Sequence, residues 1–193
     1  WEALPDQFVI KCNHGCGLNF LCPDKKKIDR KSVVKQLKKW MSLEYWTYFA
    51  EPQYKYIKKK ILIEEYLGDN IHTYKFYCFN EVPKICYVSS NGENGEYDKY
   101  YDYFDMEWNR QETYLMGHDH LPGDIEKPDN FGEMKSIATQ LCKGFPFVRI
   151  DLYSINGKVY FSEYTFIPTG GYMHLAPEGT DVEWGKWLCL EGK

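Results

Sequence analysis

The stretch from Phe147 to Gly171 constrains the fold of this chain most strongly, because it encodes two strands and spaces charged groups along them. In the first strand, Arg149 and Asp151 alternate with apolar residues, which is the period of a half-buried strand. The second strand carries Glu163 and Thr165. The sequence therefore predicts a hairpin whose charged side chains meet only if the loop sets the register correctly.

Two loops are compatible with the sequence. A two-residue Asn156-Gly157 turn would pair Asp151 with Ser162 and place Glu163 on the opposite face. A three-residue loop, with Gly157 as a left-handed bulge, would instead pair Arg149 with Glu163 and put both carboxylates on one face. Such carboxylates repel unless a hard cation lies between them, and Mg²⁺ binds through one or two carboxylates plus substrate phosphates. A surface hairpin with an Arg–Glu pair is the alternative.

Composition excludes several classes of protein. The 193 residues allow one domain or two small lobes, and a net charge of −4 predicts no general attraction to nucleic acid. We expect no membrane span and no signal peptide, since no apolar run is long enough. Because the chain opens on Trp1, a preceding segment is expected to be missing. The high aromatic content, 18% with 17 Tyr, suggests either a ligand groove or a core built from tyrosine.

Seven cysteines without regular spacing do not predict a disulfide framework, so we expect reduced thiols and a cytoplasmic protein. Cys12, Cys16 and Cys22, with His14 among them, have spacings that fit zinc poorly.

A glycine-bearing loop follows the first predicted strand, which ends at Lys11. Gly15 and Gly17 would allow backbone N–H groups to close over an anion, and Lys11 could place its ammonium on the same phosphate. A tight turn is the alternative, because the P-loop pattern is absent.

The apolar run Ile61–Ile63 predicts a strand that ends in acids and Gly68, suitable as a hinge whose backbone could pair with a purine. A second hairpin is predicted at residues 73–89, and it carries Lys75 among aromatics, where a buried lysine must face an anion or reach solvent. The alternative interpretation of the Ile61–Ile63 run is an ordinary buried strand.

Two helices are predicted, one capped by Asp29 and running to about Met41, the other capped by Asn130 with Glu133 completing a capping box. Between them, residues 92–128 lack periodicity, which is typical of a functional or mobile segment. Pairs at Asp105/Glu107 and His118/His120 are alternative metal sites in this segment. The order of elements indicates an α+β fold, with a sheet-and-helix lobe at residues 1–60 and a hinge strand plus second lobe at residues 61–193.

Six segments in this order resemble the ATP-grasp superfamily, and more closely its TupA-like branch, over nearly all of residues 4–190. They are FVIKCNHGCGLNFLC, ILIEEYL, YKFYCFN, FDMEWN, KPDNFGEMKSIATQL and FPFVRIDLYSINGKVYFSEYTFIPTGG. The resemblance implies an ATP-grasp fold, in which ATP lies between two α+β lobes with antiparallel sheets. It also implies an additional N-terminal α/β domain, which we expect to be absent or removed because the first predicted strand starts by Gln7.

The resemblance implies roles for the residues at matching positions. Lys11 would hold an ATP phosphate beneath a lid formed by His14, Gly15, Cys16 and Gly17. The adenine would lie against Glu64, Glu65, Tyr66 and Leu67, and Lys75 would be a further phosphate contact. Arg149 would stabilise the transferring phosphoryl group, and Mg²⁺ would bind Asp151, Glu163 and Thr165. Two residues depart from the pattern: Thr165 where asparagine is usual, and Cys16 where serine is usual.

The implied activity is ATP-dependent activation of a carboxylate, followed by amide formation with an amine. The branch is associated with bacterial surface polysaccharides, which implies a uronic acid on a saccharide as acceptor and an amino acid or other amine as donor. A metal-dependent glycosyltransferase using Asp105 and Glu107, and a non-catalytic nucleotide- or glycan-binding module, remain alternatives.

Overall fold

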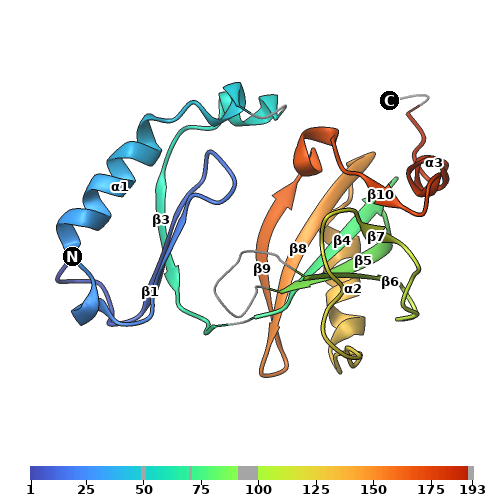
Figure 1. Ribbon diagram of the computed structural model, residues 1–193, viewed down its shortest axis with the longest axis horizontal. Helices are drawn as coiled ribbons and strands as arrows, with labels where there is room; N and C mark the ends of the chain where they lie inside the picture. Colours follow the sequence, from blue (N-terminus) through green and yellow to red (C-terminus); the bar gives the residue numbers. More distant parts are fainter. Residues whose placement is uncertain (49–50, 70, 91–99, 191–193) are drawn as a thin grey trace. The chain divides into compact units, whose positions relative to one another are not determined.

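The computed structural model describes residues 1–48, 51–69, 71–90 and 100–190 (Figure 1). The chain divides into two compact units, an N-terminal unit, Trp1–Gly68, and a C-terminal unit, Asp69–Lys193. The strand predicted to open the second lobe, Ile61–Glu65, pairs with the strand Phe8–Cys12 inside the N-terminal unit. The first residues of the irregular segment, 92–99, lie outside the described residues.

The N-terminal unit is a three-stranded antiparallel sheet with one helix packed on it. Its strand order is β2-β1-β3, and Phe8, Ile10 and Cys22 of the sheet are buried with Val33 of the helix. Its elements are β1 (Phe8–Cys12), β2 (Asn19–Cys22), α1 (Arg30–Ser42) and β3 (Ile61–Glu65), with short 3-10 helices at Lys25–Lys27, Tyr45–Thr47 and Pro52–Tyr56.

Helix α1 begins where the sequence predicted. The Asp29 carboxylate accepts hydrogen bonds from the backbone N–H groups of Lys31 and Ser32, at 3.1 and 3.0 Å. These bonds satisfy two of the N–H groups that a helix start leaves without partners. Asp29 therefore fixes the position at which the helix begins.

The C-terminal unit is built on a five-stranded antiparallel sheet of order β6-β5-β4-β8-β9. A two-stranded sheet, β7 with β10, lies in the same unit. The elements are β4 (Thr73–Phe79), β5 (Val82–Ser90), β6 (Tyr100–Asp105), β7 (Tyr114–Leu115), α2 (Phe131–Leu141), β8 (Phe147–Ile155), β9 (Lys158–Thr165), β10 (Leu175–Ala176) and α3 (Thr180–Gly185), with a 3-10 helix at Pro168–Gly171.

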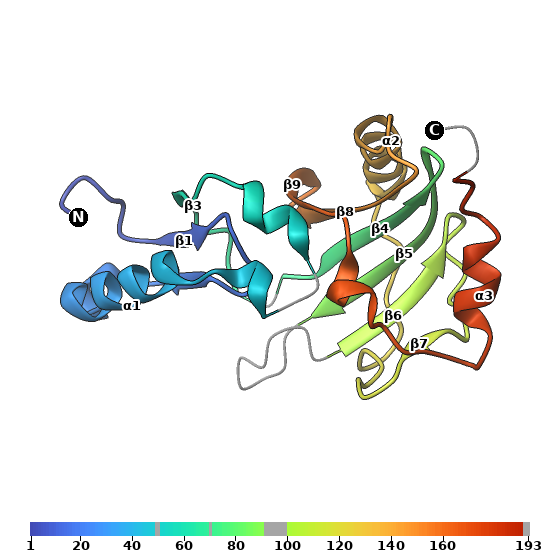
Figure 2. The same ribbon diagram turned by 90° about the horizontal axis from the view of Figure 1, so that it is seen from above.

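The two faces of the large sheet differ in what covers them. Helix α2 packs on one face, where Phe76 and Ile150 are fully buried against Phe131 and Met134. The other face is tyrosine-rich, and Trp184 of α3 packs on it. Figure 2 shows α2 and α3 on different sides of the sheet. Side chains alternate between the faces along each strand, so the charged residues of β8 fall on the tyrosine-rich face.

The loop between β8 and β9 is the two-residue turn, with φ of 51° at Asn156 and 75° at Gly157. Neither expected pairing is observed: Arg149 does not pair with Glu163, and Asp151 does not pair with Ser162. The register shifts between Leu152 and Asp151, because Ser162 is an extra residue on β9 and forms a bulge. The bulge aligns Asp151 with Glu163 and Arg149 with Thr165. The expected sharing of one face is nevertheless observed, because the bulge compensates for the shorter turn.

The second helix begins without the predicted cap. Asn130 precedes α2, but its side chain makes no capping hydrogen bond; its Oδ1 accepts one from the Ser154 hydroxyl at 2.9 Å. The hydrogen bond from Ser154 on β8 thus takes the place of the capping box and links the start of the helix to the sheet. The hairpin at Asn80-Glu81 forms as predicted, with positive φ at both residues.

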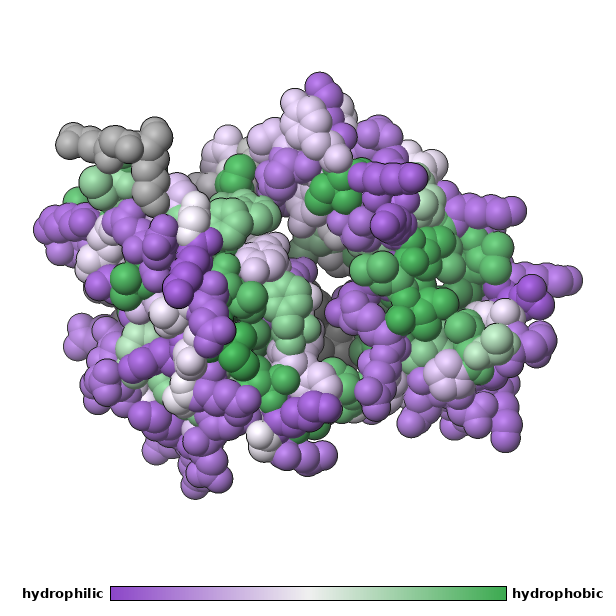
Figure 3. All heavy atoms as spheres, turned by 180° about the vertical axis from the view of Figure 1, so that it is seen from behind, coloured by the Kyte–Doolittle hydropathy of each residue, from purple (hydrophilic) through white to green (hydrophobic). Residues whose placement is uncertain are grey.

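Within the described residues, no helix has the length and apolar character needed to cross a bilayer. The view in Figure 3 shows a largely hydrophilic surface with hydrophobic side chains gathered in limited areas. Three exposed apolar residues belong to the edge strand β3: Ile61, Leu62 and Ile63 are 43, 42 and 50% exposed. The alternative interpretation of this run as an ordinary buried strand is therefore wrong.

Candidate nucleotide and metal site

Arg149, Asp151, Glu163 and Thr165 form a connected hydrogen-bonded group on the tyrosine-rich face. The Arg149 guanidinium donates from Nε and Nη2 to the two carboxylate oxygens of Asp151, both at 2.7 Å. Nη2 also donates to Thr165 Oγ1 at 2.9 Å and lies 3.5 Å from Glu163 Oε1. The Thr165 hydroxyl in turn donates to Glu163 Oε1 at 3.3 Å. The geometry therefore brings together the four residues that the hairpin pattern selected.

Burial separates the two carboxylates into different roles. Asp151 is 2% exposed and its partner Arg149 10% exposed as side chains, whereas the Glu163 side chain is 52% exposed. Desolvation, followed by the negative charge of Asp151, raises the pKa of Glu163 above its ordinary value. Burial alone would lower the pKa of Arg149, but the charge of Asp151 and its hydrogen bonds raise it well above the ordinary value. Glu163 is thus the accessible carboxylate of the two.

Lys75 stands beside this group on the adjacent strand. It is buried, at 4% exposure, and its register partners are Asp151 on β8 and Tyr87 on β5. A buried lysine in a strand must either face an anion or reach solvent, and the Lys75 ammonium lies between an acid and an aromatic ring. It faces the charged group rather than solvent.

The oxygen donors of this group fit a hard divalent cation whose coordination is completed by a bound substrate. Asp151, Glu163 and Thr165 offer only oxygen atoms, which are the ligands that a hard divalent cation prefers. Among the described residues there is no group of three or more His, Cys, Asp or Glu able to hold a metal by itself. A cation here would need further oxygens from a substrate, as Mg²⁺ with phosphates does.

In the N-terminal unit, the sequence-predicted residues Lys11 and Glu64 meet across adjacent strands. Lys11 Nζ lies 2.6 Å from Glu64 Oε2, with 26 and 43% of the side chains exposed. Both project from the sheet face opposite Ile10, the residue that packs toward α1. The pair holds the Lys11 ammonium on the sheet face opposite α1, with 26% of the Lys11 side chain exposed.

The predicted lid loop between β1 and β2 is anchored at its base and near its centre. Asn13 donates to the Lys58 carbonyl at 3.1 Å and accepts from the Lys60 N–H at 2.7 Å. His14, 1% exposed, donates from Nε2 to the Trp40 carbonyl at 3.0 Å. His14 therefore holds the loop against α1, a structural position rather than an open phosphate contact.

The two glycines of that loop have different reasons to be glycine. A Cβ on Gly15 would lie 2.5 Å from the Tyr45 ring, whereas Gly17 has φ of +70° and open space around it. Cys16 between them is exposed. Gly17 is therefore the glycine of the loop with open space beside its backbone.

The predicted adenine segment runs along a free strand edge. Glu64 and Glu65 end β3, which pairs only with β1 among the described residues, and Tyr66 and Leu67 follow it in irregular chain. All five residues of β3 are exposed. An edge strand presents unpaired N–H and C=O groups, which is the geometry that pairing with a purine edge requires.

Asp105 of the alternative metal pair Asp105/Glu107 is engaged in a turn. The Asp105 carboxylate accepts hydrogen bonds from the Glu107 and Asn109 N–H groups and from Asn109 Nδ2, at 2.8–2.9 Å. Burial alone would raise the pKa of Asp105, but these hydrogen bonds lower it below its ordinary value. The residue caps a turn, a role that its Asp-x-x-x-Asn spacing signals.

The two histidines of the same segment have separate partners. His120 Nδ1 lies 2.7 Å from the buried Asp102 carboxylate, whereas His118 packs edge-on against the Tyr101 ring. In the N-terminal unit, Cys12 and Cys22 are buried and Cys16 is exposed. All seven cysteines, each in the described part of the chain, are free thiols.

Sequence reasoning missed the tyrosines that surround the charged group. Tyr77, the register partner of Arg149, and Tyr87, the register partner of Lys75, are each 3% exposed. Burial raises the pKa of Tyr77 to about 12, and its hydroxyl donates to Met173 Sδ at 3.0 Å. Alternation along β4 and β5 would have placed them on the face of Lys75, but only the strand pairing shows which tyrosine meets which cation.

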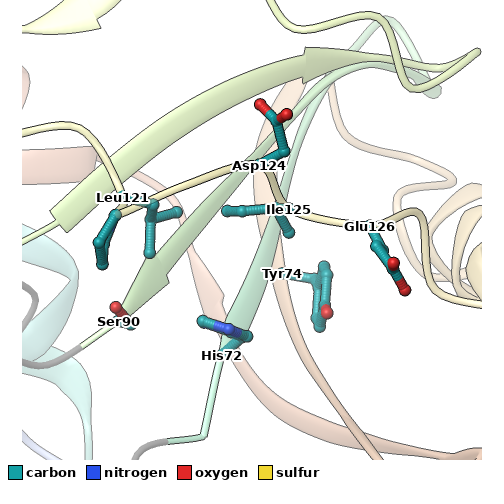
Figure 4. A pocket seen from close by; sticks show the side chains of 8 residues that line it. His72, Tyr74, Ser90, Leu121, Asp124, Ile125 and Glu126 are labelled. Carbon is teal, nitrogen blue, oxygen red and sulfur yellow. The ribbon is translucent and has the colours of Figure 1, made fainter.

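A hollow of about 430 Å³ lies elsewhere in the C-terminal unit (Figure 4). Tyr74, which lines it, belongs to the core under α2, so the hollow is on the opposite sheet face from Lys75. Burial lowers the pKa of His72 at its wall. None of the predicted site residues lines it; its walls are His72, Tyr74, Ser90, Leu121, Pro122, Asp124, Ile125 and Glu126.

Comparison with known proteins agrees with the fold. The model of the TupA-like ATP-grasp family matches residues 1–189, nearly the whole chain, so the chain belongs to that family. The α+β architecture with antiparallel sheets is accordingly an ATP-grasp fold.

Two solved structures are similar to the chain. D-alanine-D-alanine ligase from Helicobacter pylori has 14% identity and a TM-score of 0.45, over 87% of this chain and 44% of that one. The ligase of the same name from Bacillus anthracis has 14% identity and a TM-score of 0.44, over 92% and 49%. This chain thus spans about half the length of these ligases. No curated protein matches it.

Proposed function

We propose that the chain is part of a Mg·ATP-dependent ligase that activates a carboxylate as an acyl phosphate for amide formation with an amine. The observation that carries the proposal is the buried charged face of the C-terminal unit, where Lys75, Arg149 and Asp151 lie beside the accessible Glu163. Membership of the TupA-like ATP-grasp family supports it. Phosphoryl transfer needs charge neutralisation and positioning above all, and this face supplies both signs of charge on rigid strands.

Each residue has a proposed task. Arg149 neutralises charge on the transferring phosphoryl group, and Lys75 and Lys11 contact phosphate oxygens. Asp151, Glu163 and Thr165 hold Mg²⁺, which would shield the phosphates and orient them. The chain around Cys16 and Gly17 closes over the phosphates and excludes water, with His14 and Gly15 holding that loop in place. The segment Glu64, Glu65, Tyr66 and Leu67 binds adenine, mainly through backbone at the central pair.

The proposed reaction balances in two steps. A carboxylate oxygen of the acceptor attacks the γ-phosphorus and ADP leaves; the amine nitrogen then attacks the acyl carbon and phosphate leaves, giving an amide. By family analogy, the acceptor is a uronic acid on a saccharide and the amine an amino acid, in the synthesis of a bacterial surface polysaccharide. We place the activity in the cytoplasm, where ATP is supplied and the free thiols stay reduced.

Oxygen transfer from a labelled acceptor tests this chemistry. With ¹⁸O in the carboxylate of a panel of uronic acids, and amines present, one label should appear in inorganic phosphate as ADP forms. ADP release without ¹⁸O in phosphate would contradict acyl phosphate formation. A sugar nucleotide consumed in place of ATP would favour the glycosyltransferase alternative, which the turn-capping role of Asp105 already weakens.

A non-catalytic nucleotide-binding module is the second candidate. The observation that favours it is the bidentate Arg149–Asp151 pair, which engages both oxygens of one proposed metal ligand. Tight ATP binding without ADP release across the whole panel would select this candidate.

A further inference from the structure

We propose that Tyr87 is a positioning residue that holds Lys75 and Arg149 in place for phosphate through the face of its ring. The inference rests on the proposed function, since it assigns a task within the same site. Tyr87 touches no part of the proposed reaction itself. It acts through the two cations.

Both cations lie over the same ring. Lys75 Nζ is 5.3 Å from the Tyr87 ring centroid, and Arg149 Cζ is 5.7 Å from it. Each distance is within the range at which a ring face attracts a cation. Lys75 reaches the ring from the neighbouring strand β4, and Arg149 reaches it from β8, one strand further away.

The ring that receives them is fixed. Tyr101 stacks on Tyr87 at 5.4 Å, Tyr77 packs at 5.5 Å and Tyr103 at 5.2 Å between ring centroids. Trp184 packs against both Tyr77 and Tyr103 and so closes the cluster from α3. Because the interior is close-packed, Tyr87 is a rigid platform rather than a mobile side chain.

A neutral platform suits this task better than a third carboxylate. Two buried cations on adjacent strands repel each other, and Asp151 already gives both its oxygens to Arg149. A further acid would hold Lys75 and Arg149, but it would also repel the phosphates that they are proposed to bind. The negative face of a tyrosine ring attracts the cations without adding net charge to the site.

The test compares two substitutions at Tyr87 with a matched control. Tyr87→Phe keeps the ring, Tyr87→Leu removes it, and Tyr74→Leu removes a buried tyrosine from the opposite face of the same sheet. The direct readout is the ring-current shift of the methylene protons next to the Lys75 ammonium and the Arg149 guanidinium, measured by NMR on the full chain. We expect upfield shifts in the unsubstituted protein, Tyr87→Phe and Tyr74→Leu, and their loss in Tyr87→Leu.

Turnover and binding of Mg·ATP give the second readout. Tyr87→Leu removes both cation–π contacts and should lower kcat by at least about tenfold, whereas Tyr87→Phe should keep most of the turnover. Equal effects of Tyr87→Leu and Tyr74→Leu on kcat, or ring-current shifts that survive in Tyr87→Leu, would overturn the inference. If the unsubstituted chain binds no Mg·ATP, the proposed function fails, whereas normal turnover in Tyr87→Leu refutes the positioning role alone.

Discussion

At the scale of single residues, the two carboxylates of the hairpin differ in how cleanly they can be tested. Asp151 is buried in a bidentate pair with Arg149. Removing it would take the closest ion-pair partner from a buried guanidinium, which costs on the order of 3–5 kcal/mol of stability. Glu163 is half-exposed and is the weaker partner of Arg149, at 3.5 Å. Substitution of Glu163 therefore separates metal binding from folding.

Glu163→Gln should reduce ATP-dependent turnover by at least about 100-fold, because the amide lacks the negative charge with which Glu163 is proposed to hold Mg²⁺. The rate of ADP release at saturating Mg²⁺ measures this loss of turnover. The free energy of unfolding, obtained from thermal unfolding, should change by less than about 1 kcal/mol. Glu107→Gln is the control and should keep full turnover, because the Glu107 side chain of the same unit is 77% exposed. Unchanged turnover in Glu163→Gln would mean that the hairpin carboxylates are structural.

The raised pKa of Glu163 predicts a pH dependence of metal binding. Mg²⁺ needs the ionised carboxylate, so affinity is full above the raised pKa and falls as pH decreases through it, by up to about tenfold per unit. The same shift means that ionising Glu163 opposes folding, so its contribution to stability falls as pH rises from the ordinary toward the raised value. Calorimetric titration with Mg²⁺ and an ATP analogue across pH measures the first effect. A pH profile as steep in Glu163→Gln would assign it to another group.

At the scale of elements, the hairpin shows what the sequence could predict. Alternation predicted the strands of Arg149 and Asp151, and Asn156-Gly157 marked the position of the turn but left two loop lengths open. The bulge at Ser162 could not be predicted, because an extra residue in a strand is selected by the packing of both faces and has no local composition of its own. Similarly, Asn130 has the right residue type for a cap, but its partner Ser154 lies on another element.

The lid loop gives a prediction about stability. Gly15→Ala should destabilise the chain by about 1–3 kcal/mol, because its Cβ would lie 2.5 Å from the Tyr45 ring and force that ring to move. Gly132→Ala in α2 meets no atom within 4 Å and should stabilise the chain by about 0.5 kcal/mol. Thermal unfolding of the two variants compares them directly. A neutral Gly15→Ala would show that the ring does not confine the loop.

At the scale of the whole molecule, the family and the α+β architecture were accessible from the sequence, because six segments in fixed order carry more information than any one motif. The tyrosine cluster around Arg149 and Lys75 was not, since Tyr77 and Tyr87 have the same sequence pattern as ordinary core residues. The division of the chain at Gly68 also depends on pairing that local sequence does not encode: β3 joins β1 across more than 45 intervening residues.

The central claim is that Glu163 and its neighbours bind ATP together with Mg²⁺. Calorimetric titration of the full chain with a non-hydrolysable ATP analogue, with and without Mg²⁺, tests it most directly. We expect Mg²⁺ to strengthen binding of the analogue at least tenfold, and Glu163→Gln to abolish that gain while leaving Mg²⁺-independent binding in place. The analogue binding equally with and without Mg²⁺ would contradict the claim.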